Sequence, residues 1–262
     1  MMDLGIRNKT ALVLGAGGGL GRAIARSLSA EGVRVALGDI DTDAVEETAR
    51  ILRTEGGTQL ALTWDLGDLS AIATNVERIE AELGPVDILV NNTGGPKPST
   101  VSGQQPDLWR DSFEAMVLSV IALTDRVLPG MRERKWGRII TSTSSGVVAP
   151  IPNLGLSNAL RVSLVGWSKT LAREVGRDGI TANIILPGRI ATPRITFLDE
   201  QKAKRESRSV AEVAAESVAA IPIGRYGQPD EYGDAVAFLA STRASYITGS
   251  VIRVDGGLIA SI

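Results

Sequence analysis

Short apolar runs alternate with longer amphipathic stretches along the whole chain, and this alternation restricts the possible folds more than any other feature. The apolar runs are predicted strands at residues 10–15, 33–39, 60–65, 86–92, 137–144, 180–188 and 250–257. Helical patterns lie between them at residues 20–30, 42–55, 69–83, 105–135, 156–176, 208–220 and 229–241. Near-continuous apolar strands separated by helices indicate a parallel sheet with helices on both faces.

The predicted elements fit one doubly wound α/β domain that spans residues 1–262. No internal repeat, low-complexity segment or linker divides the chain. The segment from about residue 190 to 220 is the exception, because it is rich in charge and interrupts the alternation. We expect this segment to form a movable flap over a substrate site.

Two residue types are absent, since the sequence contains no cysteine and no histidine. Their absence excludes a disulfide framework, a thiolate nucleophile, a Ser-His-Asp triad and an HExxH metal site. Proton transfer must therefore use Asp, Glu, Lys, Tyr, or a hydroxyl group assisted by a neighbour or by water. A formal net charge of −2 gives no basic surface for nucleic acid or a membrane, and no apolar segment is long enough to span one. We therefore expect a soluble, cytoplasmic protein.

A glycine-rich segment, LGAGGGLGRAIA, joins the first predicted strand to the first predicted helix. Gly15, Gly19 and Gly21 follow the spacing GxxxGxG, which suits a tight turn and lets the backbone approach a pyrophosphate at a helix N-terminus. The second strand ends at Asp39, whose carboxylate can bind ribose hydroxyls and would repel a 2′-phosphate. Gly18 supplies no basic side chain for such a phosphate, so NAD is favoured over NADP. The alternatives are a tight strand–helix turn without a ligand, and a helix cap or turn at Asp39.

With these motifs the chain resembles the short-chain dehydrogenase/reductase family over essentially its whole length. The resemblance also rests on WDLGD around Asp65, on NNTG at 91–94, on PGRIAT at 187–192, and on a C-terminal segment that ends in RVDGG. It implies a seven-stranded Rossmann fold, a nicotinamide cofactor and a homotetramer or homodimer. It assigns cofactor contacts to Gly15, Gly19, Leu20, Gly21, Asp39, Ile40, Asp65, Leu66, Asn91, Gly94, Arg161, Pro187, Gly188, Ile190 and Thr192.

Two of these assignments have plain structural alternatives. Asn91, or its neighbour Asn92, can serve only to hydrogen-bond adjacent strands. Thr192, which precedes Pro193, can be an ordinary turn residue. The sequence alone leaves both alternatives open.

The catalytic set that the resemblance implies, Asn-Ser-Tyr-Lys, is mostly missing. Ser144 stands at the serine position, but Ser157 replaces the tyrosine, Arg161 the lysine and Met116 the asparagine. The pattern NLGLSNALR resembles a β-ketoacyl-reductase-like branch with an imperfect tetrad. Arginine stays charged and is a poor proton shuttle, but it can bind ribose hydroxyls or polarise a carbonyl oxygen. Ser157 and Arg161 share one helix face because they are four residues apart.

These residues predict a clamp of two hydroxyl groups, from Ser144 and Ser157, with Arg161 beneath it and water as the proton source. In the opposing interpretation Ser157 is a residue of the first helical turn, Arg161 anchors its own fold and Met116 fills the core. Arg189 can bind an anionic substrate or lie on the surface.

Two functions remain compatible with the sequence. The first is an atypical NAD(H)-dependent oxidoreductase that acts on an alcohol/carbonyl pair, with 3-oxoacyl-reductase-like chemistry as one form. The second is a non-catalytic NAD(H)-binding sensor or partner-stabilising subunit. The apolar faces of 105–135 and 156–176 are expected to pack between subunits, or else only on their own sheet; they contain Leu118, Ile121, Leu128, Leu164, Val165 and Trp167.

Overall fold

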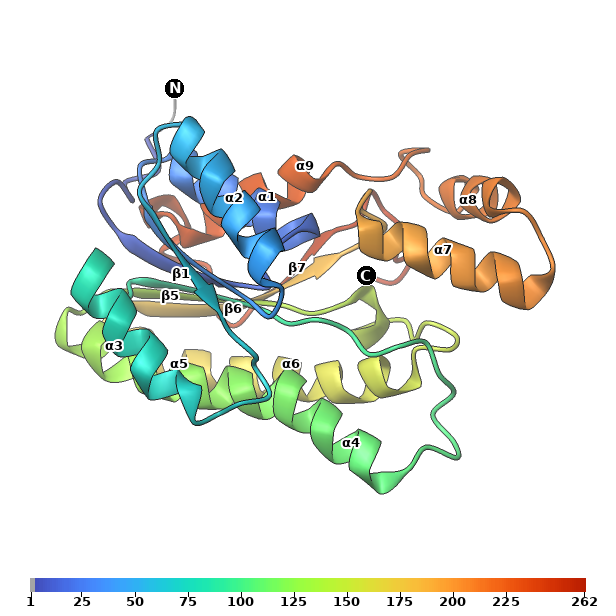
Figure 1. Ribbon diagram of the computed structural model, residues 1–262, viewed down its shortest axis with the longest axis horizontal. Helices are drawn as coiled ribbons and strands as arrows, with labels where there is room; N and C mark the ends of the chain where they lie inside the picture. Colours follow the sequence, from blue (N-terminus) through green and yellow to red (C-terminus); the bar gives the residue numbers. More distant parts are fainter. Residues whose placement is uncertain (1–2) are drawn as a thin grey trace.

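Seven parallel strands form the central sheet of the computed structural model, which describes residues 3–262 (Figure 1). The strands are β1 (Thr10–Leu14), β2 (Arg34–Asp39), β3 (Gln59–Thr63), β4 (Ile88–Asn92), β5 (Gly137–Ser142), β6 (Ile180–Pro187) and β7 (Val251–Val254). Their order across the sheet is β3-β2-β1-β4-β5-β6-β7. Each lies within or close to the segment that the sequence predicts, so the predicted doubly wound parallel sheet is confirmed.

Helices cover both faces of this sheet (Figure 1). One face carries α1 (Gly19–Ala30), α2 (Thr42–Thr54) and α9 (Pro229–Ala240). The other carries α3 (Ala71–Leu83), α4 (Pro106–Phe113), α5 (Ser119–Glu133) and α6 (Gly155–Val175). Two further helices, α7 (Pro193–Glu206) and α8 (Val210–Ala219), project beyond the carboxyl end of β6.

The buried strands explain why the sequence lacks a polar–apolar alternation. All five residues of β1 are buried, and successive side chains point to opposite faces. Ala11 and Val13 pack in the layer with α1, α2 and α9, whereas Leu12 and Leu14 pack in the layer with α3, α5 and α6. Both faces of the strand are therefore core.

The strand order places a crevice between the loops that follow β1 and β4. From β1 the chain proceeds to β2 on one side, and β4 pairs with β1 on the other. Ligands of doubly wound sheets bind at such a switch point, outside the carboxyl ends of the strands. The glycine-rich segment, Asp39, Asn92, Ser144 and Pro187 all lie at this edge.

The predicted helix over residues 105–135 is divided in two. A π-helical segment, Glu114–Leu118, separates α4 from α5 and contains Met116. Such π-turns widen a helix locally and occur often at functional sites. No repeat of apolar residues distinguishes a π-turn from an ordinary helical turn, so the sequence pattern could not predict it.

Residues 193–206 form a helix, α7, that the sequence analysis does not predict. The sequence does contain signals for the start of this helix, but they are short. Thr192 caps the helix by accepting a hydrogen bond from the Ile195 amide, and Pro193 follows at the first helical position. Ser209 and Glu212 then form a capping box that begins α8. High charge, with no clear apolar face, obscured the helical period.

The apolar faces of α5 and α6 are only partly available to a second subunit. Leu128 and Leu164 are buried in the chain's own core, so their expected place between subunits is wrong. Leu118 is 37% exposed and Val162 is 48% exposed, and these remain on the surface. Across residues 3–262, no helix combines the length and apolar character that crossing a membrane requires.

Candidate functional site

A cavity of about 1640 Å³ opens at the carboxyl edge of the sheet. The glycine-rich segment and the ends of β2 and β3 line one part of it, and α6 with the loops after β4 and β5 line another. Helices α7 and α8 and residues 258–260 form its outer wall. Its volume exceeds the usual range for one small ligand, and it has room for a dinucleotide beside a substrate.

The structure gathers most of the predicted site residues around this cavity. Thirteen of the fifteen predicted cofactor contacts line it: Gly15, Gly19, Leu20, Asp39, Ile40, Asp65, Leu66, Gly94, Arg161, Pro187, Gly188, Ile190 and Thr192. Ser144, Ser157 and Met116 line it as well. Gly21 and Asn91 do not line it.

The glycine-rich segment has the backbone that a phosphate-binding turn needs. Gly15 and Gly19 have φ of +59° and +51°, in the left-handed region that favours glycine. A side chain at Gly18 would meet nothing within 4 Å, so the space in front of the α1 N-terminus is open. The segment therefore fits the pyrophosphate of a dinucleotide. Gly21 has another purpose, because a Cβ there would stand 1.9 Å from the Gly15 carbonyl oxygen, and its absence allows α1 to pack closely.

Asp39 supports the glycine-rich segment at the end of β2. Its Oδ2 atom accepts a hydrogen bond of 2.8 Å from the Gly17 amide, and its Oδ1 atom accepts one of 3.0 Å from the Asp41 amide. The residue that caps α2 is Asp41, which accepts from the Ala44 amide at 3.0 Å. Asp39 is thus not the helix cap considered from sequence, and its carboxylate faces the cavity.

The two asparagines of the NNTG motif point to different places. Asn91 is fully buried, and its Nδ2 atom donates to Thr124 and Thr141 at 3.4 and 3.3 Å. This side chain ties β4 to β5 and α5, which is the strand-bonding alternative considered from sequence. Asn92 lines the cavity and donates to the Leu14 and Gly15 carbonyl oxygens, which joins β4 to the glycine-rich segment.

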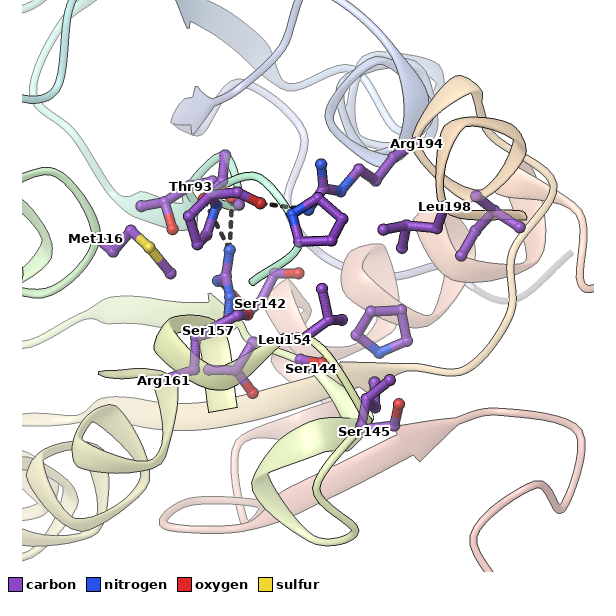
Figure 2. Close-up of a pocket in the computed structure, with 18 of the residues that line it drawn as sticks. Thr93, Met116, Ser142, Ser144, Ser145, Leu154, Ser157, Arg161, Arg194 and Leu198 are labelled. Carbon is purple, nitrogen blue, oxygen red and sulfur yellow. Dashed lines mark hydrogen bonds between the residues drawn. The ribbon is translucent and has the colours of Figure 1, made fainter. Parts of the chain in front are cut away.

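Ser144 and Ser157 present hydroxyl groups to the same part of the cavity (Figure 2). Ser144 Oγ accepts a hydrogen bond of 3.1 Å from the Gly146 amide, and this bond leaves its own proton available to a ligand. Ser157 lies in the first turn of α6, and its hydroxyl has no hydrogen-bond partner among residues 3–262. Asn158 holds this end of α6 by bonding both backbone groups of Ile151.

Arg161, one helical turn beyond Ser157, is buried with only 6% of its surface exposed. Its Nη2 atom donates to the Thr93 and Gly94 carbonyl oxygens at 3.0 and 2.9 Å, and Nη1 reaches the Ser142 carbonyl oxygen at 3.4 Å (Figure 2). Burial, and secondarily the positive charge of Arg194, lower the Arg161 pKa to about 10. The guanidinium therefore stays charged at neutral pH. It ties the loop after β4 to the end of β5.

Met116 contributes an apolar wall where the resemblance implies an asparagine. It is buried in a cluster with Leu156 and Leu160 and also faces the cavity. The packing role considered from sequence is thus present. No polar group of this side chain can hold a water molecule for a proton relay.

Two residues of the site were not found from sequence. Arg194, on the first turn of α7, lines the cavity and donates to the Pro96 carbonyl oxygen at 2.8 Å. Tyr232, on α9, is buried behind β5, and its hydroxyl lies 2.8 Å from Ser142 Oγ. Burial raises the Tyr232 pKa well above its usual value, so this tyrosine is a poor proton donor at neutral pH.

Arg189 is already engaged by a carboxylate. Its Nη1 atom lies 2.6 Å from Oδ1 of the buried Asp199, and the Tyr226 hydroxyl donates to Asp199 Oδ2 at 2.7 Å. These bonds join the loop after β6 to α7 and to the segment before α9. Arg189 lines the cavity, but its pairing with Asp199 weakens the predicted role in binding an anion. Residues 3–262 contain no group of three potential metal ligands among Asp and Glu side chains.

Comparison with known proteins agrees with this geometry. A family model described as enoyl-(acyl carrier protein) reductase matches residues 15–259. The 3-oxoacyl-(acyl-carrier-protein) reductase of Salmonella typhimurium is 39% identical over 259 residues, which cover 97% of this chain and 99% of that protein. The acetoacetyl-CoA reductase of Shinella zoogloeoides is 33% identical and covers 95% of this chain and 98% of its own length.

Solved structures give the same result. L-sorbose reductase from Gluconobacter frateurii, complexed with NADPH and L-sorbose, superimposes with a TM-score of 0.93 at 32% identity, over all of both chains. Actinorhodin polyketide ketoreductase with NADPH gives 0.91 at 34% identity, over 95% of this chain and 97% of its own.

The chain therefore belongs to the short-chain dehydrogenase/reductase family, a class of oxidoreductases built on the Rossmann fold. Within that family it falls in the 3-oxoacyl-reductase-like branch. The predicted class of enzyme is confirmed, and a nicotinamide cofactor is supported.

Proposed function

We propose that this protein is an NADH-dependent reductase of small carbonyl compounds, or a dehydrogenase of the corresponding alcohols, with an altered proton path. One observation carries the proposal: Ser144, Ser157 and Arg161 face the same cavity as the intact glycine-rich segment. The relatives named above act on carbonyl/alcohol pairs, which supports the same reaction class here.

The residues of the cavity fit a nicotinamide dinucleotide. The open space at Gly18 and the amides before α1 suit the pyrophosphate, and Asp39 suits the adenosine ribose. Asp65 and Leu66 line the adenine side, whereas Gly188, Ile190 and Thr192 line the opposite part. When bound, the nicotinamide supplies or accepts the hydride, and the protein contributes orientation and electrostatics.

Asp39 favours NADH over NADPH. Its carboxylate faces the cavity, and the residues closest to it in sequence, Gly38 and Ile40, carry no positive charge to bind a 2′-phosphate. The two solved relatives named above contain NADPH, so this preference separates the chain from them. Asp39→Ser should improve NADPH binding relative to NADH by at least about 10-fold, measured by fluorescence titration. Asp43→Ser, in the first turn of α2, is the matched control and should leave the ratio unchanged.

The proton must come from water rather than from a tyrosine. The free proton of Ser144 can donate to a substrate oxygen, and Ser157 offers a second hydroxyl without a competing partner. Arg161 adds a permanent positive charge beneath them, which stabilises negative charge that develops on that oxygen. None of these groups releases a proton easily at neutral pH, and so water completes the transfer.

The non-catalytic alternative rests on a specific contact of Arg161. Its guanidinium binds three carbonyl oxygens of the chain, as expected for a structural anchor. In that case the protein would bind NADH as a sensor or as a stabilising subunit and would transfer no hydride.

Titration with NADH and NADPH, followed by turnover assays with acetoacetyl-CoA and a short oxo acid, tests the proposal. We expect micromolar NADH binding, weaker NADPH binding and steady NADH oxidation with a carbonyl compound. NADH binding with no turnover on any carbonyl substrate would favour the sensor. Absence of binding for both dinucleotides would contradict both functions.

A further inference from the structure

Two guanidinium groups approach one point of the cavity wall. A Cβ built on Gly95 would stand 3.1 Å from Nη2 of Arg194 and 3.9 Å from Nη2 of Arg161. The two arginines come from different elements, α6 and α7, and they meet at the loop that follows β4 (Figure 2). Both line the cavity.

Within the described residues 3–262, neither arginine has a counter-ion. No carboxylate of residues 3–262 lies within 4.0 Å of either guanidinium, although the neighbouring cations Arg189 and Lys202 are paired with Asp199 and Glu216. In the described part of the chain, both arginines donate hydrogen bonds only to backbone carbonyl oxygens, which satisfy the donors without neutralising the charge. Two like charges held this close, one of them buried, are unfavourable unless an anion binds between them.

The surroundings indicate which anion fits. Apolar side chains make up much of the wall near the serines, among them Met116, Leu154, Leu156 and Leu198. A carboxylate on a short apolar body would place its charge on the arginines and its body against this wall. Ser157 lies one helical turn from Arg161, so a carbonyl group at the serines would be only a few bonds from that carboxylate.

We infer that Arg161 and Arg194 form a carboxylate-binding site and that the substrate is a short oxo acid or its hydroxy acid. This inference rests on the proposed reductase function and narrows its substrate class. In the reductive direction the carbonyl carbon gains the hydride, its oxygen gains a proton from water, and the nicotinamide is oxidised. The carboxylate itself does not react.

A phosphate of the cofactor is the other source of negative charge, and its expected place differs. The pyrophosphate belongs at the α1 N-terminus, where the glycine-rich segment leaves open space at Gly18. The two arginines instead lie at the loop after β4, beside the serines. Substrate binding and cofactor binding must therefore be measured separately.

The test uses the NAD⁺-loaded protein and two probes, pyruvate and acetoacetate, each compared with its uncharged methyl ester. Cofactor and probe are then both in their oxidised forms, so no hydride transfer occurs, and isothermal titration calorimetry reports binding alone. We expect at least one acid to bind about 10- to 100-fold more tightly than its ester, the range for charge-assisted hydrogen bonds. Arg194→Gln should remove this difference, and Arg194→Lys should retain part of it. Arg205→Gln, on the exposed side of the same helix, should leave it unchanged.

Each other outcome has a definite meaning. Equal binding of acids and esters by the wild-type protein would overturn the inference. Weaker NADH binding by Arg194→Gln, with the preference for acids intact, would assign the arginine to the cofactor instead. If NADH fails to bind but an acid raises the melting temperature of the wild type and not of Arg194→Gln, the carboxylate site stands and the proposed reductase function falls.

Discussion

At the scale of single residues, the cavity is defined by a buried cation beside two hydroxyl groups. Arg161 stands where the family resemblance implies a lysine, and its planar guanidinium holds the Thr93 and Gly94 carbonyl oxygens together. Ser144 and Ser157 remain free to donate toward the cavity. The chemistry proposed here thus depends on hydrogen-bond donors and fixed charge, and not on a residue whose pKa lies near neutrality.

Removing either hydroxyl should reduce catalysis without disturbing cofactor binding. Ser144→Ala and Ser157→Ala should each lower kcat/KM by about 10²- to 10³-fold, because a donor to the developing oxyanion is lost. Their NADH dissociation constants should stay within a factor of three of the wild type, about 0.6 kcal/mol. Ser163→Ala, on the exposed side of α6, is the control. Full activity of Ser157→Ala would limit the hydroxyl role to Ser144.

At the scale of secondary-structure elements, α7 and α8 form the outer wall of the cavity. Glu216 on α8 accepts a hydrogen bond of 2.9 Å from Lys202 on α7 and another from Arg208 in the intervening turn. These contacts lower the Glu216 pKa from 4.5 to about 2. The wall is therefore held in part by a solvent-exposed ion cluster, which suits a segment that opens and closes.

The ion cluster should make the α7–α8 pair sensitive to acid. A depressed carboxyl pKa contributes stability above the unfolded value, and this contribution disappears as the pH falls from 4.5 toward 2. Glu216→Gln should therefore speed amide exchange in residues 210–219 at pH 7, measured by hydrogen-exchange mass spectrometry. Glu200→Gln, at an exposed carboxyl on α7, should not. Equal exchange in both variants would show that apolar contacts alone hold α8.

A second prediction at this scale concerns the contact between α1 and the end of β1. Gly21→Ala should destabilise the fold by about 1–3 kcal/mol, because its Cβ would overlap the Gly15 carbonyl oxygen and force α1 outward. Gly166→Ala on α6, where a Cβ meets nothing within 4 Å, should instead stabilise the chain by about 0.5–1 kcal/mol. Urea unfolding measures both changes. Equal stability of the two variants would contradict the close-packing role of Gly21.

At the scale of the whole molecule, the face formed by α4, α5 and α6 carries exposed apolar side chains. Leu108, Phe113, Leu118 and Val162 are each more than a third exposed, whereas the buried side chains of α5 and α6 pack against the sheet. Single exposed apolar residues are ordinary, but four on one layer of helices suit an interface between subunits. We propose a homodimer or homotetramer that uses this face.

Light scattering coupled to size exclusion tests this interface. The wild-type protein should elute at two or four times the mass of one chain, 27.6 kDa. Val162→Glu should shift it to a smaller species, because burying an unpaired carboxylate is unfavourable. Val210→Glu, at a comparably exposed position on α8, should have no effect. A wild-type mass of one chain would contradict the proposed oligomer.

The parallel sheet, most of the helices and the edge of the sheet that carries the site could be predicted from the sequence pattern. Apolar runs such as 10–15 and 137–144 form strands that are buried on both faces of the sheet. A strand of this kind is apolar along its whole length, so it can be recognised from the sequence. Motif residues at the ends of parallel strands must meet at one edge of the sheet, so the sequence alone predicts that Asp39 and Ser144 lie at the same edge. The capping signals around α7 are short, and the high charge of this segment hides its helical period. The sequence pattern therefore does not predict this helix.

The contacts of individual side chains depend on the folded structure and could not be predicted from the sequence. Asn91 turns into the core and Asn92 toward the cavity, although they are adjacent, because successive strand residues face opposite sides. In the sequence, nothing distinguishes Arg194 from the many charged residues that lie on the protein surface. The packing of α7 against the loop after β4 brings it close to Arg161. Pairing of Arg189 with Asp199, and the lack of such a partner for Arg161 and Arg194, depend on distances between elements that are far apart in the chain. Periodicity and spacing describe local structure, and so they carry no information about these contacts.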